Sequence, residues 1–436
     1  MSATAPLRAN IKQQPGTIRN FRWYICGLLL YATTVNYIDR AVLGILEPTI
    51  AKDLHWTDAD YGRITFAFQI GYAVMMPLAG RLIDWIGLRA GYALCTLLWS
   101  ISSLAHSFAN SGVQFAFARL GLGLGEAANF PACIKAVADW FPKHERALAT
   151  GVFNGGSNLG AILAPLTVPL VYAAFGWRAC FLFTGSLSLM FVVLWTLVYR
   201  EPEQHRRLSS QELAFIRTDQ QGISTDTVPY RQLLGDRASW AFLVGKFLTD
   251  PVWWFYLFWL PNFLHTDFHV EVAHIGAPLV AVYAASAVGS IYGGWLSSWF
   301  IKRGWTVQKA RQAAMLVCAI SVVAVVFVPE VAWSLWFTVA LIGIGAAAHQ
   351  GWSANLYTVV SDNFPRAAVG SVVGLGGLGG AVAGAIVQLS VGKWLTVSHA
   401  AYAPIFFICG SAYLLALLII HMLLRGRTET AVPSGF

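Results

Sequence analysis

Long apolar runs dominate the chain, and short polar segments separate them. A run of about 20 apolar residues is enough to cross a lipid bilayer as a helix. We count twelve such runs, at approximately residues 22–46, 60–82, 88–109, 112–138, 148–173, 177–199, 238–264, 274–300, 310–328, 332–360, 367–392 and 401–424. The pattern therefore predicts an all-α membrane protein with 12 transmembrane helices.

The polar segment 200–237 is the one long connection, and it divides the twelve runs into six plus six. We predict a tail at 1–20, a six-helix bundle at 21–199, a central loop at 200–237, a second bundle at 238–425 and a tail at 426–436. The halves match weakly, since Trp140-Phe-Pro recurs as Asn363-Phe-Pro and Gly80 to Trp85 compares with Gly294 to Trp299. Two pseudo-symmetric halves around a midplane site are typical of secondary transporters.

Composition and charge agree with a membrane location. Hydrophobic residues make up 57% of the chain and charged residues only 11%, whereas soluble domains carry about 25% charged residues. Of the 29 Lys and Arg, we assign 21 to one side of the membrane and four to the other. This asymmetry predicts cytoplasmic termini by the positive-inside rule, and it explains the net charge of +8 without nucleic acid.

The sequence contains no clear targeting signal and no cysteine motif. No cleavable signal peptide is visible, and the absence of an Asn-x-Ser/Thr sequon fits a bacterial inner membrane. The six cysteines lie singly in apolar runs, without the spacing of a metal site or a disulfide framework. We therefore expect no metal.

Two opposite charges lie inside the apolar run 112–138. Each costs about 2.5–3.5 kcal/mol at the bilayer centre on insertion scales. Arg119 and Glu126 share one helix face but lie about 10 Å apart along the axis, so each needs another partner or a water-filled cavity. They are either part of a buried structural ion pair or the lining of a cavity that binds an anion and a proton. Gly121 and Gly125 between them form a small-xxx-small pair for close helix contact.

Asp39 in the first apolar run lies at a depth similar to that of Arg119, and we predict that the two pair. Glu126 is the first candidate for the proton carrier, because burial away from water favours a neutral carboxyl group. Asp39 is the second, since a neighbouring cation keeps it ionised longer. Arg40 and Arg119 suit a substrate carboxylate through the planar guanidinium fork.

The second half offers a matching polar cluster. A shift of 223 residues places Glu126 on His349, which is followed by Gln350, Trp352, Ser353 and Asn355. His349 is either a hydrogen-bonding wall residue or a proton relay. Trp352 is either part of a sugar-binding face or an interfacial packing residue. Candidate substrate contacts are Tyr37, Tyr72, His349, Gln350, Trp352 and Asn355.

Other charged residues in or near the apolar runs have simpler interpretations. Lys246 and Asp250 are four apart on one helix, so they are a local pair or the mark of a substrate preference. Lys135 and Asp139 have the same spacing near a helix end, and we expect a loop anchor. We expect Glu47, at the outer end of its run, to be solvated.

These motifs together resemble those of a known family. The loop from Gly80 to Arg89 resembles the signature loop of the major facilitator superfamily. The segments Asn36-Tyr-Ile-Asp-Arg40, Arg119 to Glu126 and Phe141 to Arg146 resemble its anion:cation symporter family. Residues 350–355 with 361–365 are similar to the hexuronate permease group, whose members carry sugar acids such as galacturonate and glucuronate.

The resemblance implies roles for particular residues. It implies proton coupling by Asp39 and Glu126, anion handling by Arg40 and Arg119, and a sugar-acid site lined by Tyr37 and Tyr72. It also implies a gating loop, whose residues are Gly80, Asp84, Gly87 and Arg89. The second copy of that loop departs from the pattern, because Ser298 stands where an acid is usual.

We therefore expect proton-coupled uptake of an organic anion, most plainly a hexuronate or related sugar acid, by alternating access. The alternatives are another carboxylate such as an aromatic acid, an exporter, or, from a different class, a membrane sensor or enzyme. A sensor needs a soluble output domain and an enzyme needs converging nucleophiles or metal ligands, and neither is visible. No phosphate-binding loop motif is present, so we expect no cofactor besides the coupling proton, a monomer, and lipid as the only other partner.

Overall fold

The computed structural model describes residues 18, 20–218, 229–364, 366–399 and 401–425. The predicted tails therefore lie almost entirely outside the described residues, as does part of the central loop. The first group of helices is α1 (Phe21–Leu54), α2 (Asp58–Ile86), α3 (Leu88–Ala105), α4 (Gly112–Glu126), α5 (Asn129–Trp140) and α6 (Lys143–Val198). The second group is α9 (Arg237–Phe258), α10 (Leu260–Phe268), α11 (Gly276–Lys302), α12 (Val307–Val322), α13 (Leu335–Asn363), α14 (Arg366–Ser398) and α15 (Ala403–Leu424).

The helices form twelve passes, although they do not correspond one to one with the apolar runs. The fourth pass is α4 and α5, which are separate helices because α4 ends at Glu126. The fifth and sixth passes form the single element α6, which turns back at Gly176, where φ is +77° and a side chain is disfavoured. The seventh pass is α9 and α10, separated at Trp259.

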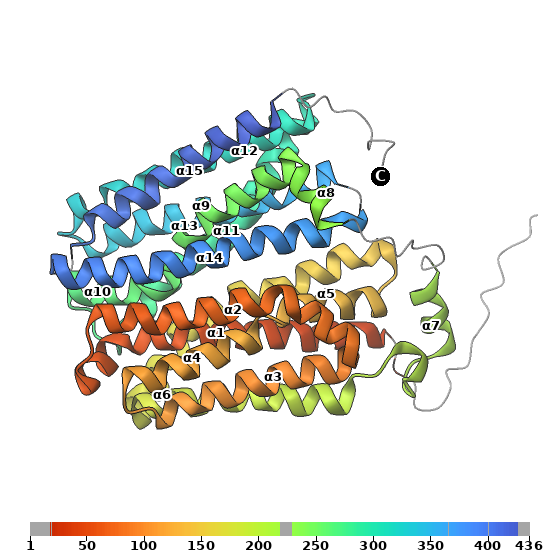
Figure 1. Ribbon diagram of the computed structural model, residues 1–436, viewed down its shortest axis with the longest axis horizontal. Coiled ribbons are helices and arrows are strands. Elements are labelled where there is room, and N and C mark those ends of the chain that lie inside the picture. The colour runs from red at the N-terminus through yellow and green to blue at the C-terminus, as the bar shows by residue number, and fades with distance from the viewer. Residues whose placement is uncertain (1–17, 19, 219–228, 365, 400, 426–436) are drawn as a thin grey trace, which may run out of the picture.

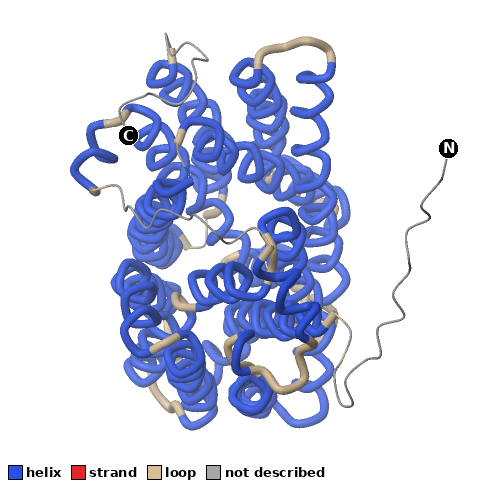
Figure 2. The backbone as a smooth tube through the Cα atoms, turned by 90° about the vertical axis from the view of Figure 1, so that its right-hand side faces the viewer, coloured by secondary structure: helices blue, strands red, loops and turns tan. Residues whose placement is uncertain are grey.

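Two helix groups lie side by side and meet along two matching seams (Figure 1, Figure 2). In one seam α2 packs on α14, and in the other α6 packs on α11. The seams pair the second pass with the eleventh and the fifth with the eighth, as expected for two pseudo-equivalent six-helix halves. At the α2–α14 seam the backbones nearly touch, because a Cβ on Gly62 would lie 3.0 Å from Gly392 Cα.

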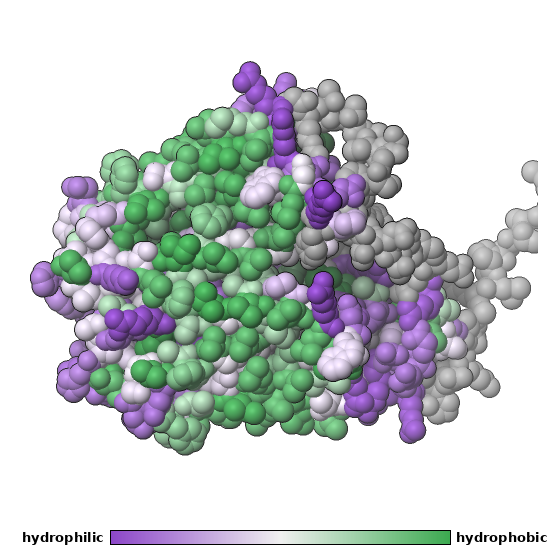
Figure 3. Space-filling view, viewed as in Figure 1, coloured by the Kyte–Doolittle hydropathy of each residue, from purple (hydrophilic) through white to green (hydrophobic). Residues whose placement is uncertain are grey.

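The outer surface carries a broad apolar band between two polar ends (Figure 3). Large apolar side chains are exposed on it, including Leu170 (72%), Ile291 (76%) and Val397 (78%). Such a surface is suited to lipid rather than water. Within the described chain, six stretches are long and apolar enough on their own to cross a membrane: Asp58–Ile86, Leu148–Val198, Gly276–Lys302, Val307–Phe327, Ala368–Ser398 and Ala403–Leu424.

The two ends of the molecule differ in how the halves meet. We call the left end in Figure 1 the α10 end and the right end the α7 end, after α7 (Ser210–Arg217). Hydrogen bonds between described residues of the two halves lie at the α10 end: Glu47 and Asp58 accept from Asn262, Tyr61 donates to Phe258 O, and Ala59 N–H donates to Thr396. The halves are therefore fastened together at the α10 end.

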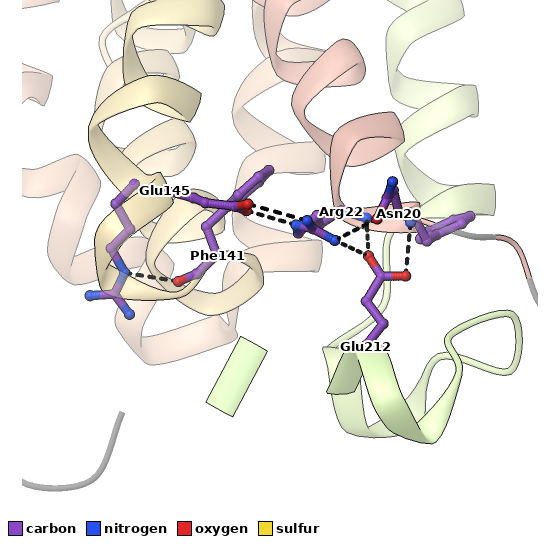
Figure 4. A network of polar contacts seen from close by, with 7 residues as sticks. Asn20, Arg22, Phe141, Glu145 and Glu212 are labelled. Carbon is purple, nitrogen blue, oxygen red and sulfur yellow. Dashed lines mark hydrogen bonds and ion pairs between the residues drawn. The ribbon is translucent and has the colours of Figure 1, made fainter. Parts of the chain in front are cut away.

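The central loop packs against the first half at the α7 end (Figure 4). Glu212 on α7 accepts hydrogen bonds from the backbone N–H groups of Phe21 and Arg22, at 3.0 and 3.2 Å, so it caps the start of α1. The Arg22 guanidinium binds Glu212 on one side, at 2.9 Å, and Glu145 at the start of α6 on the other, at 2.8 Å. Arg22 thus ties α1 to both α6 and α7.

Candidate central cavity

A polar cavity of about 200 Å³ lies between the two halves. Its walls come from α1, α2 and α4–α6 of the first half and from α9, α13 and α14 of the second. Of the residues predicted to bind substrate or proton, six line it: Tyr37, Arg40, Tyr72, Glu126, His349 and Gln350. The structure therefore brings together residues that are more than 300 positions apart in the sequence.

The Arg40–Glu126 pair is the main electrostatic feature of the cavity. Arg40 Nε donates to Glu126 Oε2 at 2.6 Å, and both side chains are almost fully buried. Four aromatic rings surround the guanidinium within 4.9–5.6 Å of their centroids: Tyr37, Phe68, Tyr72 and Trp254. Glu126 Oε1 has no hydrogen-bond partner within the described structure. The pair joins α1 to α4, so breaking it leaves both a cation and a carboxylate unpaired beside the aromatic rings of the cavity.

The predicted Asp39–Arg119 pair does not form. The Asp39 carboxylate instead accepts hydrogen bonds from Trp99 Nε1 at 2.7 Å, Ser103 at 2.7 Å and Ser188 at 2.5 Å. Asp39 and Arg40 are adjacent on a helix and therefore point about 100° apart. Arg40 faces α4 and the cavity, whereas Asp39 faces α3 and α6.

Arg119 is buried behind the cavity rather than on its wall. It is 1% exposed, and none of its three guanidinium nitrogens has a hydrogen-bond partner among the described residues. The ring of Phe68 lies 5.9 Å from its guanidinium carbon. A buried guanidinium without hydrogen bonds is costly.

In the second half, one face of α13 lines the cavity and the other faces do not. His349, Gln350, Ser353 and Tyr357 are on the lining. The His349 ring stacks on Trp253 at 5.4 Å between centroids, and its Nδ1 lies 2.5 Å from the Tyr413 hydroxyl. The structure therefore places His349 in the wall, hydrogen-bonded to a neighbouring helix.

Trp352 and Asn355, which we predicted to contact substrate, do not reach the cavity. Trp352 is fully buried against Tyr413 of α15, with 5.3 Å between ring centroids. Asn355 donates to the carbonyl oxygens of Gly293 on α11 and Gly351 on α13, both at 2.9 Å. Both residues lie on faces of α13 that point away from the cavity. Trp352 packs against α15, and Asn355 binds backbone carbonyl groups of α11 and α13.

Lys246 and Asp250 form the local pair, and they also line the cavity. Lys246 Nζ lies 2.7 Å from Asp250 Oδ2, one turn further along α9. The same ammonium group lies 3.3 Å from the Tyr357 hydroxyl and 4.9 Å from the centre of its ring. Lys246 and Asp250 are therefore a local ion pair, and their place on the cavity wall is also compatible with an influence on substrate preference.

Several cavity residues escaped the sequence analysis: Thr33, Asn36, Met76, Asn129, Phe130, Asn154, Ser157, Trp253, Trp254 and Tyr357. Helical spacing is the signal that would have found some of them. Thr33, Asn36 and Tyr37 lie three or four positions before Arg40 or one another, and Trp253 and Trp254 follow Asp250 by the same interval. Asn36 has an amide with no hydrogen-bond partner in the described structure.

The loop between α2 and α3 clamps neighbouring helices. Asp84 pairs with Lys135 of α5, and Arg89 donates to Thr196 O of α6 at 2.5 Å. Gly87 has φ of +83°, which explains the glycine at this turn. A Cβ on Gly80 would meet nothing within 4 Å, so this glycine is not needed for packing in the present conformation. Lys135 therefore anchors to the loop rather than to Asp139.

Two other predictions about helix packing have clear outcomes. The close contact predicted for Gly121 and Gly125 is confirmed, because added Cβ atoms would clash with Ser102 and Trp99 of α3. The prediction that Glu47 is solvated is wrong. Glu47 is 2% exposed and accepts from Asn262 Nδ2 at 2.5 Å, because α10 covers it at the closed end.

Two six-helix halves, twelve passes and a polar cavity between the halves define a secondary membrane transporter. The model of the Major Facilitator Superfamily matches residues 29–388. The chain belongs to this family, and it is a transporter rather than an enzyme.

Relatives and solved structures agree with this assignment. The chain is 29% identical to the hexuronate transporter of Escherichia coli K12, over 96% of this chain and 97% of the relative. It is 32% identical to the galacturonate transporter of Dickeya chrysanthemi, over 65% and 84%. Its fold matches the crystal structure of a bacterial homologue of the human lysosomal transporter Spinster in an inward-facing, occupied conformation, with a TM-score of 0.68, 19% identity and coverage of 94% and 96%.

Proposed function

We propose that this protein imports a sugar acid, a hexuronate such as galacturonate or glucuronate, together with protons. The observation that carries the proposal is the Arg40–Glu126 pair inside the cavity. The hexuronate and galacturonate transporters among its relatives support the choice of substrate class. We place the protein in a bacterial inner membrane as a monomer, with the α7 end in the cytoplasm, where the excess of Lys and Arg belongs.

Coupling follows from the cost of a buried unpaired charge. A lone charge left by breaking a buried pair costs about 3–5 kcal/mol, so Arg40 always needs an anion. Without substrate, that anion is Glu126. When a substrate carboxylate takes Arg40 in a bidentate geometry, Glu126 loses its cation and binds a proton. The loaded cavity then has the same net charge as the empty one, and the halves can rock around it.

Uptake into liposomes tests this proposal. Purified protein in proteoliposomes is given labelled galacturonate or glucuronate, with and without an inward proton gradient, beside a Glu126→Gln variant. We expect the gradient to concentrate substrate in wild type. The variant should exchange internal for external substrate but not accumulate it, because Gln cannot carry a proton.

The possible results separate the parts of the proposal. Accumulation by the variant would make Glu126 structural and transfer the coupling role to Asp39. Accumulation of neither acid by wild type, with binding of other carboxylates, would overturn the substrate class and leave the transporter class intact.

A further inference from the structure

We infer that the Lys246–Asp250 pair is a hydroxyl-recognition subsite, which binds the sugar end of the substrate while Arg40 binds its carboxylate. This inference rests on the proposed function and adds an orientation to it. It predicts that the substrate has one carboxylate and several hydroxyl groups, rather than two carboxylates.

The pair lies in the cavity opposite the Arg40 site, on the other half of the molecule. Both residues are on α9, whereas Arg40 is on α1. The Tyr37 ring lies 4.9 Å from the Arg40 guanidinium carbon and lines the same cavity as Lys246. A substrate that spans the cavity past Tyr37 therefore reaches both sites.

The pair behaves differently from Arg40–Glu126 because it belongs to one helix. Arg40 and Glu126 are on α1 and α4, so their pairing depends on the position of these two helices relative to each other. Lys246 and Asp250 are one turn apart on α9 and move as one body. The pair therefore stays closed and electrically neutral while the halves rock. A neutral pair has no spare cation for a second carboxylate.

A closed Lys–Asp pair is nevertheless rich in hydrogen-bonding groups. The ammonium group has three donors and the carboxylate about four acceptor sites. The contact between them uses one of each, and a second donor bonds to the Tyr357 hydroxyl at 3.3 Å, so one donor and about three acceptor sites remain. Neighbouring sugar hydroxyls both donate and accept, so they match this arrangement. Asn36, whose amide has no partner in the described structure, adds a further donor and acceptor to the cavity. Trp253 and Trp254 supply aromatic surface beside it.

The packing of α14 fixes the position of the pair. A Cβ on Gly380 would clash with the Asp250 carboxylate, with its Cγ only 2.9 Å away. A Cβ on Gly376 would clash with Phe242 and lie 3.3 Å from Lys246 Cγ. These two glycines, one turn apart, therefore provide the space that the pair occupies, and Gly380 is a positioning residue for Asp250.

Equilibrium binding to the purified protein, measured by calorimetry, tests the inference with three probes. Galacturonate has one carboxylate and several hydroxyls, galactarate has two carboxylates, and cyclohexanecarboxylate has one carboxylate and no hydroxyl. The double variant Lys246→Met with Asp250→Leu removes the pair without leaving a lone charge. The double variant Lys246→Asp with Asp250→Lys keeps a neutral pair, and Gly380→Ala displaces Asp250.

We expect wild type to bind galacturonate most tightly. The apolar double variant should weaken galacturonate binding about tenfold or more, since hydrogen bonds to charged groups are each worth about that factor. Its affinity for cyclohexanecarboxylate should be unchanged. The exchanged pair should recover part of the galacturonate affinity, and Gly380→Ala should lose affinity for galacturonate alone.

Other outcomes would overturn the inference. If wild type prefers galactarate and the apolar variant loses only that preference, Lys246 is a second carboxylate site. If the variants lose galacturonate and cyclohexanecarboxylate equally, the pair is structural. If wild type binds cyclohexanecarboxylate but neither sugar acid, the proposed function fails and this inference falls with it.

Discussion

At the scale of the residue, the two buried carboxylates of the first half are held in different ways. Glu126 has one charged partner and one free oxygen, whereas Asp39 has three hydrogen-bond donors from α3 and α6. The Asp39 carboxylate therefore ties α1 to α3 and α6, whereas the Glu126 carboxylate is tied to Arg40 alone among the described residues.

We predict that Asp39→Asn lowers the thermal unfolding midpoint. The Asn amide places an N–H group where one carboxylate oxygen accepts, so at least one of the three hydrogen bonds to the charged acceptor is lost, at a cost of about 1–3 kcal/mol. Trp99→Phe removes the indole donor from the same group. In the double variant the loss should be smaller than the sum of the two single losses. Simple additivity would show that Trp99 and Asp39 stabilise the protein independently.

The residue scale also shows what the sequence cannot determine. The rise per residue predicted that Asp39 and Arg119 lie at similar depth, but the observed ion pair joins Arg40 to Glu126, about two helical turns from Arg119. Depth leaves the rotation of each helix about its axis unknown, and rotation decides which of two adjacent residues faces a given neighbour. That is why Arg40, and not Asp39, lies opposite a charge on α4. The same limit explains why Trp352 and Asn355 face away from the cavity.

At the scale of the element, the twelve passes could be predicted from the runs of apolar residues together with the polar segments that separate them. The breaks within passes could not, because they depend on packing. Glu126 ends α4 in the middle of an apolar run, and Trp259 separates α9 from α10. The docking of α7 on α1 also lacked a sequence signal, because Glu212 reaches backbone groups that any residue would present.

His205, in the central loop before α7, makes the docking of this loop dependent on pH. Its ring packs on Phe21 at 4.2 Å and on Trp140 at 5.5 Å, measured between ring centroids. Burial lowers the pKa of His205 below its ordinary value of 6.5. The neutral ring uses both nitrogens, because Nε2 faces Val198 O at 3.2 Å and Nδ1 accepts from the Arg207 N–H at 3.3 Å.

We predict that the central loop loosens as the pH falls below about 6.5. The undocked loop binds a proton more readily than the docked one, so its stabilisation is complete above 6.5 and declines below it. Protection factors for the α7 amides, which are hydrogen-exchange rates corrected for the intrinsic pH dependence of exchange, measure the effect at pH 7.5 and 5.5. His205→Gln should abolish the difference between the two pH values. An equal difference in that variant would assign the pH dependence to another group.

At the scale of the whole molecule, the glycine contact between α2 and α14 keeps the α10 end closed. A Cβ on Gly62 would lie 2.7 Å from Gln388 O and 3.0 Å from Gly392 Cα. Both are backbone atoms, which cannot rotate away. The halves can therefore approach this closely only with glycine at the seam.

We predict that Gly62→Ala shifts the population toward states with the α10 end open. An overpacking cost of about 1–3 kcal/mol corresponds to a shift of roughly ten- to a hundredfold. Spin labels at Lys52→Cys and Lys393→Cys, both exposed at this end, report the distance between the halves, and all six native cysteines are buried. Gly27→Ala is the matched control, because Gly27 is exposed and a Cβ there meets nothing within 4 Å. Identical distance distributions in the two variants would contradict the prediction.

The placement of the two ion pairs has a consequence for how such proteins diversify. The Arg40–Glu126 pair is built entirely from the first half, and the Lys246–Asp250 pair entirely from α9 of the second. With the roles proposed above for the two pairs, selection on the transported substrate acts on one half of the gene while the proton-coupling pair in the other half stays unchanged. We expect a hybrid that carries its second half from a relative with a different sugar acid to change its nutrient and keep its dependence on the proton gradient.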